Sequence, residues 1–103
     1  MATKTYAGKI IQVNDEGYFL NSSDWSREIA IEVAKEEGIE LTEKHFALVD
    51  FIRDRVQKGE ALTIRSMGKS GIVDIKGFYE LFPGAPLKKA TKIAGVGKPT
   101  SCV

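Results

Sequence analysis

One side chain in this sequence combines a reactive chemical group with an unusual position in the chain. Cys102 is the sole cysteine of 103 residues and is the penultimate residue. The segment around it, LKKATKIAGVGKPTSCV from 87 to 103, contains four lysines and no acidic side chain. A thiolate is the nucleophile in sulfur chemistry, and nearby positive charge stabilises that anion. The pattern predicts a sulfur-handling cysteine, with Lys98 and Lys92 as candidate anion-stabilising groups.

The residues before Cys102 favour an arm that moves. Gly95 and Gly97 supply backbone freedom and are candidate hinges, while Pro99 stiffens the end of the chain. We expect a single domain over residues 1–94 and a mobile C-terminal arm over residues 95–103. The alternative is an incidental terminal thiol, with lysines that only keep an exposed tail soluble.

Composition excludes several other kinds of site. A single cysteine forms no internal disulfide and offers no ligand spacing for a metal, so we expect no metal site. Hydrophobic residues make up 43% and charged residues 28% of the chain, as in ordinary globular proteins. No apolar run approaches the ~20 residues of a membrane span, and no signal peptide is recognisable. We therefore expect a cytoplasmic protein without a membrane partner.

The charge is divided unevenly along the chain. Residues 1–60 carry eight Lys/Arg against twelve Asp/Glu, whereas residues 61–103 carry seven against two. Arg65, Lys69 and Lys76 are candidates for a basic patch that contacts RNA or a protein partner, although solvated surface explains them equally well. His45, the only histidine, is a candidate neighbour of the arm but is more typical of a structural helix residue.

The elements that must position the arm are mostly helical. Lys4 to Leu20 predicts a hairpin with a strand at 9–13, a turn at 14–17 and a return at 18–20. The capping cluster at 21–24 then predicts a helix over 25–38, in which Trp25 anchors the core. Thr42 predicts the start of a second helix that runs to 58 and stops at Gly59.

The C-terminal half carries weaker signals. We expect a short helix or turn after residue 60, an extended piece at 71–75 and a short helix or turn at 78–82. Residues 87–94 predict two helical turns, with Gly95 in the left-handed conformation that ends a helix.

Several of these segments resemble one protein family. The tail ATKIAGVGKPTSCV, the YELFPGAPLKK before it, the Asp24-Trp25 pair and EEGIELTEKHF are similar to the TusE and DsrC family of sulfur-relay proteins. The resemblance runs from about Gly17 to the C-terminus. It implies a mainly α fold with a small N-terminal β-hairpin, a helix-turn-helix-like core and a flexible C-terminal arm. On that arm Cys102 would accept sulfur as a covalent persulfide, with no other cofactor.

The resemblance also implies a role and partners. DsrC members carry a second cysteine eleven residues before the penultimate one, and Thr91 occupies that position here. The chain is thus similar to TusE, a sulfurtransferase that acts as a stoichiometric carrier. Such a carrier takes sulfur from a TusBCD-like complex and gives it to a thiouridylase-like protein for tRNA 2-thiouridine synthesis, with any contact to tRNA indirect.

Two alternatives stay open. The first is a DsrC-type gamma-subunit partner of dissimilatory sulfite reductase or of a related sulfur-oxidation system. The second is a helix-turn-helix DNA-binding regulator, which the acidic first half disfavours. Two departures from the family pattern stand out: residues 66–80 are shorter than expected by about two helical turns, and Gly97 replaces a common proline.

Overall fold

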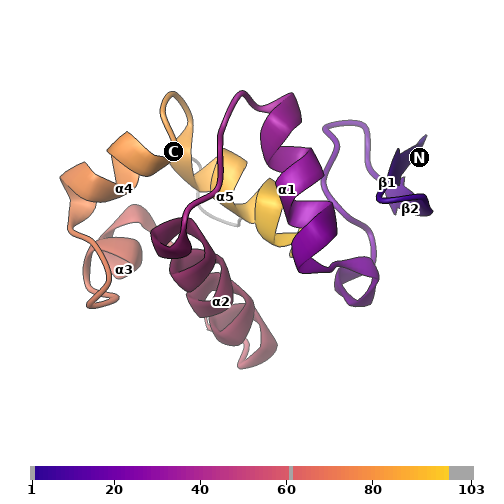
Figure 1. Cartoon of the computed structure of the whole chain (residues 1–103). Helices are drawn as coiled ribbons and strands as arrows, with labels where there is room; N and C mark the ends of the chain where they lie inside the picture. Colours follow the sequence, from indigo (N-terminus) through magenta and orange to yellow (C-terminus); the bar gives the residue numbers. More distant parts are fainter. Residues whose placement is uncertain (1, 61, 98–103) are drawn as a thin grey trace.

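The computed structural model describes residues 2–60 and 62–97 (Figure 1). Its order of elements is β1 (Ala2–Tyr6), β2 (Lys9–Val13), the 3₁₀ helix η1 (Ser22–Asp24), α1 (Arg27–Glu36), α2 (Glu43–Gln57), α3 (Ile64–Gly68), α4 (Ile75–Leu81) and α5 (Pro86–Ala94). The mainly α fold with a small N-terminal hairpin is confirmed. None of the helices in this described part is long and apolar enough to cross a membrane.

The hairpin begins earlier in the chain than the sequence suggested. β2 is confirmed, but its antiparallel partner is β1, with Ala2 opposite Val13 and Tyr6 opposite Lys9. Ala7 and Gly8 form the turn with φ of 51° and 75°. Positive φ at both central residues is the requirement of a type I′ turn, whose twist matches that of the strands. The prediction missed this turn because Gly8 is its only sequence signal.

The predicted turn at residues 14–17 exists but leads to no strand. The Asn14 side chain accepts hydrogen bonds from the backbone N–H groups of Glu16 and Tyr18. A single bridge between Val13 and Phe19 follows. Tyr18 and Phe19 are buried, so this segment contributes to the core and does not extend the sheet.

α1 starts two residues later than predicted. The capping cluster forms its own 3₁₀ turn, η1, whose cap is Asn21. Ser26 caps α1 by accepting from the N–H of Ile29, and Trp25 lies between the two in extended conformation. A Ser or Asn can cap either a turn or a helix, so sequence alone could not choose between them.

α2 agrees with the prediction at both ends. Its N-cap is Thr42, and Gly59 beyond its last turn has φ of 73°. His45 completes a capping box in which its Nδ1 accepts from the Thr42 N–H at 3.0 Å. The buried face of this helix contributes Leu48, Val49 and Ile52 to the core.

The segment after α2 contains two short helices. The extended piece predicted at 71–75 is not a strand: residues 71 and 72 form a bend, Asp74 is extended as the cap of α4, and Ile75 already belongs to α4. Asp74 caps α4 by accepting from the N–H of Gly77 at 2.7 Å. The helix expected at 78–82 is thus present but begins three residues earlier.

α5 occupies the centre of the molecule. It contacts α1, α2 and α4, while the hairpin and the α3–α4 pair lie at opposite ends (Figure 1). Leu87, Ala90, Ile93 and Ala94 on α5 are all fully buried. The helix expected at 87–94 is therefore confirmed, and its last residue leads directly into the predicted arm.

Candidate functional site

The structure describes the base of the arm and not its end. Cys102 and Lys98 lie outside the described residues, so their predicted roles stay predictions. What can be described is how α5 ends and how residues 95–97, called the arm base here, leave it. Two short-range hydrogen bonds and two long-range ones control this exit.

The short-range bonds form a Schellman motif. Gly95 has φ of 68° and ψ of 30°, the left-handed conformation that the sequence predicted. Its N–H donates to the carbonyl of Lys92, and the N–H of Val96 donates back to the carbonyl of Thr91 at 3.3 Å. These bonds satisfy two of the four carbonyls that a helix leaves free at its C-terminus.

The other two carbonyls accept from side chains that are distant in sequence. Trp25 Nε1 donates to the carbonyl of Ile93, and Arg53 Nη1 donates to that of Ala94, both at 2.8 Å. The guanidinium of Arg53 lies 4.3 Å from the centroid of the Trp25 ring and also donates to the Ser22 carbonyl. We call Trp25 and Arg53 the exit clamp, because together they fix the point at which the chain leaves α5.

Sequence reasoning found only half of this clamp. Trp25 was expected to anchor the core, but Arg53 was not singled out. One signal was available: Arg53 follows Val49 by four positions and therefore lies beside the apolar face of α2. Burial lowers the pKa of Arg53, opposed by the charge of Asp50. An arginine stays protonated in either case, so the clamp keeps its positive charge beside the C-terminal end of α5.

The clamp also limits the residue at position 95. A Cβ on Gly95 would lie 2.7 Å from Cδ1 and 3.0 Å from Cβ of Trp25. Gly97 also has positive φ, 87°, but a Cβ there would meet only the Phe19 carbonyl at 3.7 Å. Gly95 is therefore tightly packed and Gly97 is not. Hinge motion at either glycine stays a prediction.

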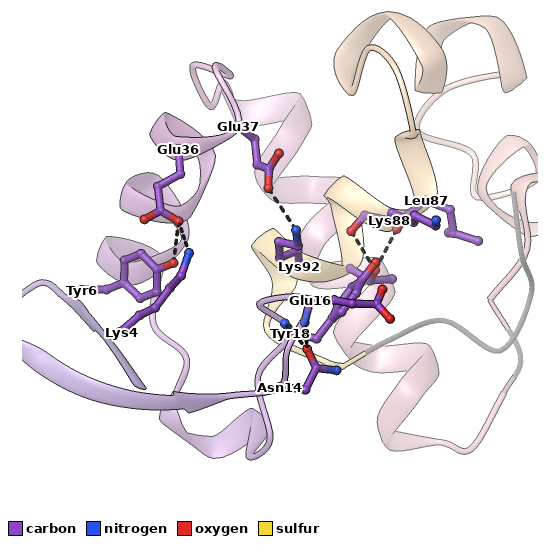
Figure 2. A network of polar contacts seen from close by, with 11 residues as sticks. Lys4, Tyr6, Asn14, Glu16, Tyr18, Glu36, Glu37, Leu87, Lys88 and Lys92 are labelled. Carbon is purple, nitrogen blue, oxygen red and sulfur yellow. Dashed lines mark hydrogen bonds and ion pairs between the residues drawn. The ribbon is translucent and has the colours of Figure 1, made fainter. Parts of the chain in front are cut away.

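Lys92, the described anion-stabilising candidate, already has partners. Its Nζ lies 3.2 Å from Glu37 Oε1, and the side chains of both residues are about three-quarters buried (Figure 2). The same ammonium is 5.4 Å from the centroid of the Tyr18 ring. Lys92 thus connects α5 to the end of α1. Its predicted role in stabilising a sulfur anion is not tested by these contacts and stays a prediction.

Thr91 is buried inside α5. Its side chain is fully inaccessible, and its Oγ1 lies 2.8 Å from the carbonyl of Leu87 and 3.1 Å from that of Lys88. The hydroxyl donates back to the preceding helical turn. The position where DsrC members would carry a second cysteine is thus part of the helix, ahead of the arm base.

His45 connects two helices. Its Nδ1 accepts from the Thr42 N–H, so the proton resides on Nε2, which donates to the carbonyl of Leu81 at 2.8 Å. The ring meets Phe82 edge-on, with centroids 5.1 Å apart. Both ring nitrogens are engaged in hydrogen bonds, one within α2 and one between α2 and α4. These contacts support a structural role for His45.

A second polar cluster joins the hairpin to α1. Tyr6 Oη donates to Glu36 Oε1, and Lys4 Nζ lies 3.1 Å from the same oxygen (Figure 2). Burial and the hydrogen bond to Glu36 raise the pKa of Tyr6 well above its ordinary value. Within residues 2–60 and 62–97, no group of three or more His, Cys, Asp or Glu side chains is arranged to hold a metal ion.

Known proteins resemble this chain over its whole length. A family model described as DsrC like protein matches residues 5–103. The dissimilatory-type sulfite reductase subunit gamma of Nitratidesulfovibrio vulgaris (strain Hildenborough) is 40% identical over 105 residues, which cover 100% of both chains. The sulfurtransferase TusE of Yersinia pseudotuberculosis is 41% identical over 106 residues, covering 95% of this chain and 98% of that protein.

Solved structures agree with these sequence matches. The NMR structure of Allochromatium vinosum DsrC has a TM-score of 0.83 at 36% identity, covering 98% of this chain and 97% of that one. The oxidized gamma-subunit of the dissimilatory sulfite reductase (DsrC) from Archaeoglobus fulgidus has a TM-score of 0.84 at 31% identity, covering 99% of this chain and 100% of that one.

The two sequence alignments differ in how much shorter they make this chain. The 105 positions shared with the Nitratidesulfovibrio gamma subunit cover all 103 residues, so this chain lacks about two positions at most. The 106 positions shared with the Yersinia TusE cover 95% of this chain, about 98 residues, so about eight positions have no counterpart here, which agrees with the expected shortening by about two helical turns. The full-length match to the family model, the relatives near 40% identity and the shared fold lead to one conclusion: the chain belongs to the family of DsrC-like proteins.

Proposed function

We propose that this protein is a sulfur-relay carrier of the TusE kind, which holds sulfane sulfur as a persulfide on Cys102. One observation carries the proposal: a chain 41% identical to a protein named sulfurtransferase TusE has a single cysteine, at its penultimate position. The protein acts as a sulfurtransferase in the stoichiometric sense, because each chain carries one sulfur atom per cycle.

The transfer step balances without an external oxidant. The thiolate of Cys102 attacks the outer sulfur of a persulfide on the donor protein, forming a bond between Cys102 Sγ and that sulfur. The bond between the outer sulfur and the donor cysteine breaks, and the donor leaves as a thiolate with the electron pair. In the onward step an acceptor thiolate attacks the outer sulfur on Cys102 in the same way. No cofactor other than this covalent persulfide enters the proposal.

In this proposal, different residues around the arm have different roles. The exit clamp holds the base of the arm, and the predicted hinges at Gly95 and Gly97 lie just beyond α5. Lys98 and Lys92 remain the proposed stabilisers of the thiolate or persulfide anion. The charge of Lys92 is largely neutralised by its ion pair with Glu37, and Lys92 would have to break this pair to contact the sulfur anion directly. We therefore expect Lys98 to contribute more to stabilising that anion.

For the direction of transfer we propose tRNA thiolation in the cytoplasm. The donor would be a TusBCD-like complex and the acceptor a thiouridylase-like protein, with tRNA reached through the acceptor. Thr91 supports this choice, because a chain without a second cysteine must find its second sulfur atom on another protein.

A second candidate role rests on the match to the gamma subunit, which is 40% identical over the whole of both chains. In that role the chain would exchange sulfur with a dissimilatory sulfite reductase or a related sulfur-oxidising system. Affinity purification of the tagged full chain from its own cells separates the two roles. Recovery of a thiouridylase supports the first, and recovery of a sirohaem-containing reductase supports the second.

Intact-protein mass spectrometry tests the chemistry itself. After incubation with a protein persulfide donor, the full chain should gain the mass of one sulfur atom, and peptide mapping should place it on Cys102. Ser101→Ala is the matched control that keeps the thiol and should load normally. An adduct that persists in Cys102→Ser would exclude the carrier chemistry proposed here.

A further inference from the structure

Three basic side chains at one end of the molecule form no ion pair with any other residue that the structure describes. Several lysines and arginines elsewhere form ion pairs, for example Lys4 with Glu36 and Lys92 with Glu37. Arg65, Lys69 and Lys76 are exposed, and no acidic side chain in residues 2–60 and 62–97 pairs with them. Their charge is therefore available to an outside group.

These residues line two adjoining hollows, of which Lys76 lines only the second. The first, of about 340 Å³, lies between α2 and α3 and is lined by Phe51, Arg55, Thr63, Arg65, Ser66 and Lys69. The second, of about 480 Å³, lies between α3 and α4 and is lined by Arg65, Gly68, Lys69, Asp74, Ile75 and Lys76. Arg65 and Lys69 line both hollows and therefore stand between them.

Apolar side chains are exposed on the same helix. Ile75 and Tyr79 are large hydrophobic residues with 47% and 43% of their surface exposed. They are four positions apart on α4, so they lie on one face of that helix. We call Arg65, Lys69, Ile75, Lys76 and Tyr79 the α3–α4 surface.

The packing of α3 on α4 gives this surface a fixed shape. A Cβ on Gly68 would lie 2.6 Å from Cγ1 of Ile75 and 3.3 Å from its backbone nitrogen. Only glycine permits this close approach of the two helices. Arg65 on α3 and Lys69, the residue that caps its C-terminus, are thus held close to Ile75 and Lys76 on α4. These residues lie at the end of the molecule away from the hairpin (Figure 1).

We propose that the α3–α4 surface is the docking site for a protein partner that presents acidic side chains around an apolar anchor. Unpaired cations at the rim steer an acidic partner and set the association rate, while the exposed Ile75 and Tyr79 offer apolar contact area. Sulfur exchange between two cysteines requires such protein-to-protein contact, so the inference rests on the proposed relay function.

The apolar pair favours protein over nucleic acid as the occupant. Sites for single-stranded nucleic acid combine a basic groove with aromatic rings on which successive bases stack. Here Tyr79 is the one aromatic ring of the α3–α4 surface, and its neighbour on the helix face is the aliphatic Ile75. The phosphate backbone of a nucleic acid is polar and would offer the exposed Ile75 side chain no apolar contact.

The first test is direct binding to a defined probe. The ¹⁵N-labelled full chain is titrated with a peptide of Glu and Asp residues around one Leu, with its Lys-substituted counterpart, and with a short single-stranded RNA. Shifts confined to amides of residues 64–79 with the acidic peptide support the proposal. No shift there, or shifts with RNA and not with the acidic peptide, overturn it.

The second test uses transfer kinetics with the purified donor that loads Cys102. Arg65→Glu combined with Lys69→Glu should raise the half-saturating donor concentration by about tenfold, with the maximal rate nearly unchanged and the salt dependence reduced. Lys35→Glu combined with Lys44→Glu is the control, since these lysines lie on α1 and α2 and are also unpaired in the described chain.

The outcomes separate the two ideas. Equal half-saturation for both double variants would overturn the docking site while the relay function stands. Absence of any transfer by the wild-type chain would overturn the relay function, and the peptide titration would then decide the docking site alone. Melting temperatures of all variants verify that the substitutions act on the surface and not on folding.

Discussion

Gly95 is required for two independent reasons. Its left-handed backbone disfavours any side chain, and the ring of Trp25 fills the space that a Cβ would need. Gly59 has a similar positive φ, 73°, but nothing lies within 4 Å of a Cβ placed there. The two glycines therefore separate the effect of conformation from the effect of packing.

Replacing each glycine by alanine should measure both effects. Gly59→Ala should lower the free energy of unfolding by about 1–2 kcal/mol, the cost of a left-handed L-residue. Gly95→Ala should cost that amount plus about 1–3 kcal/mol more, because the indole must move. Urea unfolding of both variants tests this. Equal losses of unfolding free energy in the two variants would show that the indole of Trp25 moves aside without an energetic cost.

The carboxylate of Glu36 makes the free energy of unfolding depend on pH in the acidic range. Partial burial alone would raise the pKa of Glu36, but hydrogen bonds from Tyr6 and Lys4 outweigh it and hold the pKa below its ordinary value. The unfolded chain then takes up the proton first. The stabilisation is complete above the unfolded pKa of about 4.3 and is lost as the pH falls from there through the lowered pKa.

Glu36→Gln should flatten this acid dependence. The variant keeps an oxygen for Tyr6 but has no charge to titrate, so it should lose less stability than wild type below pH ~4.3. Unfolding measured along a pH series checks the difference. Glu28→Gln is the control on the same helix, since no cation in the described chain pairs with Glu28. A wild-type curve parallel to that of Glu36→Gln would refute the assignment.

At the scale of elements, the hairpin contains a local weakness. Its type I′ turn puts Ala7 at φ of 51°, the one positive φ of a non-glycine residue in the described chain. Asn tolerates this conformation and Asn-Gly is the preferred dipeptide for the turn. Ala7 is exposed, so a larger side chain meets no packing cost.

Ala7→Asn should therefore stabilise the protein. We expect a gain of about 0.5–1 kcal/mol in the free energy of unfolding, with Ala7→Val giving a loss because a β-branched residue resists positive φ. Thermal and urea unfolding of the pair provide the measurement. A loss for both variants would mean that the turn is not type I′ in solution.

Elements with local signals could be predicted from sequence, and those set by distant partners could not. α2 was placed within a residue because Thr42 and Gly59 mark its ends. β1 was missed because a strand of five residues needs a partner, and the choice of partner depends on a turn with little signal. His45 escaped notice as part of a capping box because glutamate or glutamine is usual at that position.

At the scale of the whole molecule, one buried cluster joins all parts. It extends from Tyr6 in the hairpin through α1 and α2 to Ala94 at the end of α5. The sole tryptophan lies where these parts meet the base of the arm. A small domain with one such core should unfold in a single cooperative step.

Two optical probes should therefore give the same transition. Trp25 fluorescence reports the exit clamp, and far-UV circular dichroism reports the helices as a set. Their midpoints and slopes in urea should coincide. A fluorescence change at lower urea would reveal that the end of α5 opens before the rest of the protein unfolds, contrary to the single core described above.

The candidate site shows the same limit of sequence reasoning. The break at Gly95 was predicted correctly because it is a local feature of the chain, and Cys102 was singled out as a candidate for the same reason. The exit clamp joins residues 68 and 41 positions apart, and no periodicity encodes such contacts. Lys92 was predicted as a candidate anion-stabilising group, and its pairing with Glu37 could not be foreseen because it depends on how α5 packs against α1.

The fixed end of α5 sets a geometric limit on sulfur delivery. Cys102 is seven positions after Gly95, with six residues between them, and a fully extended chain covers about 3.3–3.6 Å per residue. Measured from Gly95, the Cα atom of Cys102 can therefore lie no farther away than about 25 Å. The described part of the protein is itself 34 Å long. In the proposed relay, a partner must therefore bring its reactive sulfur within about this distance of Gly95, and each residue inserted after Gly95 would extend the reach by about 3.5 Å.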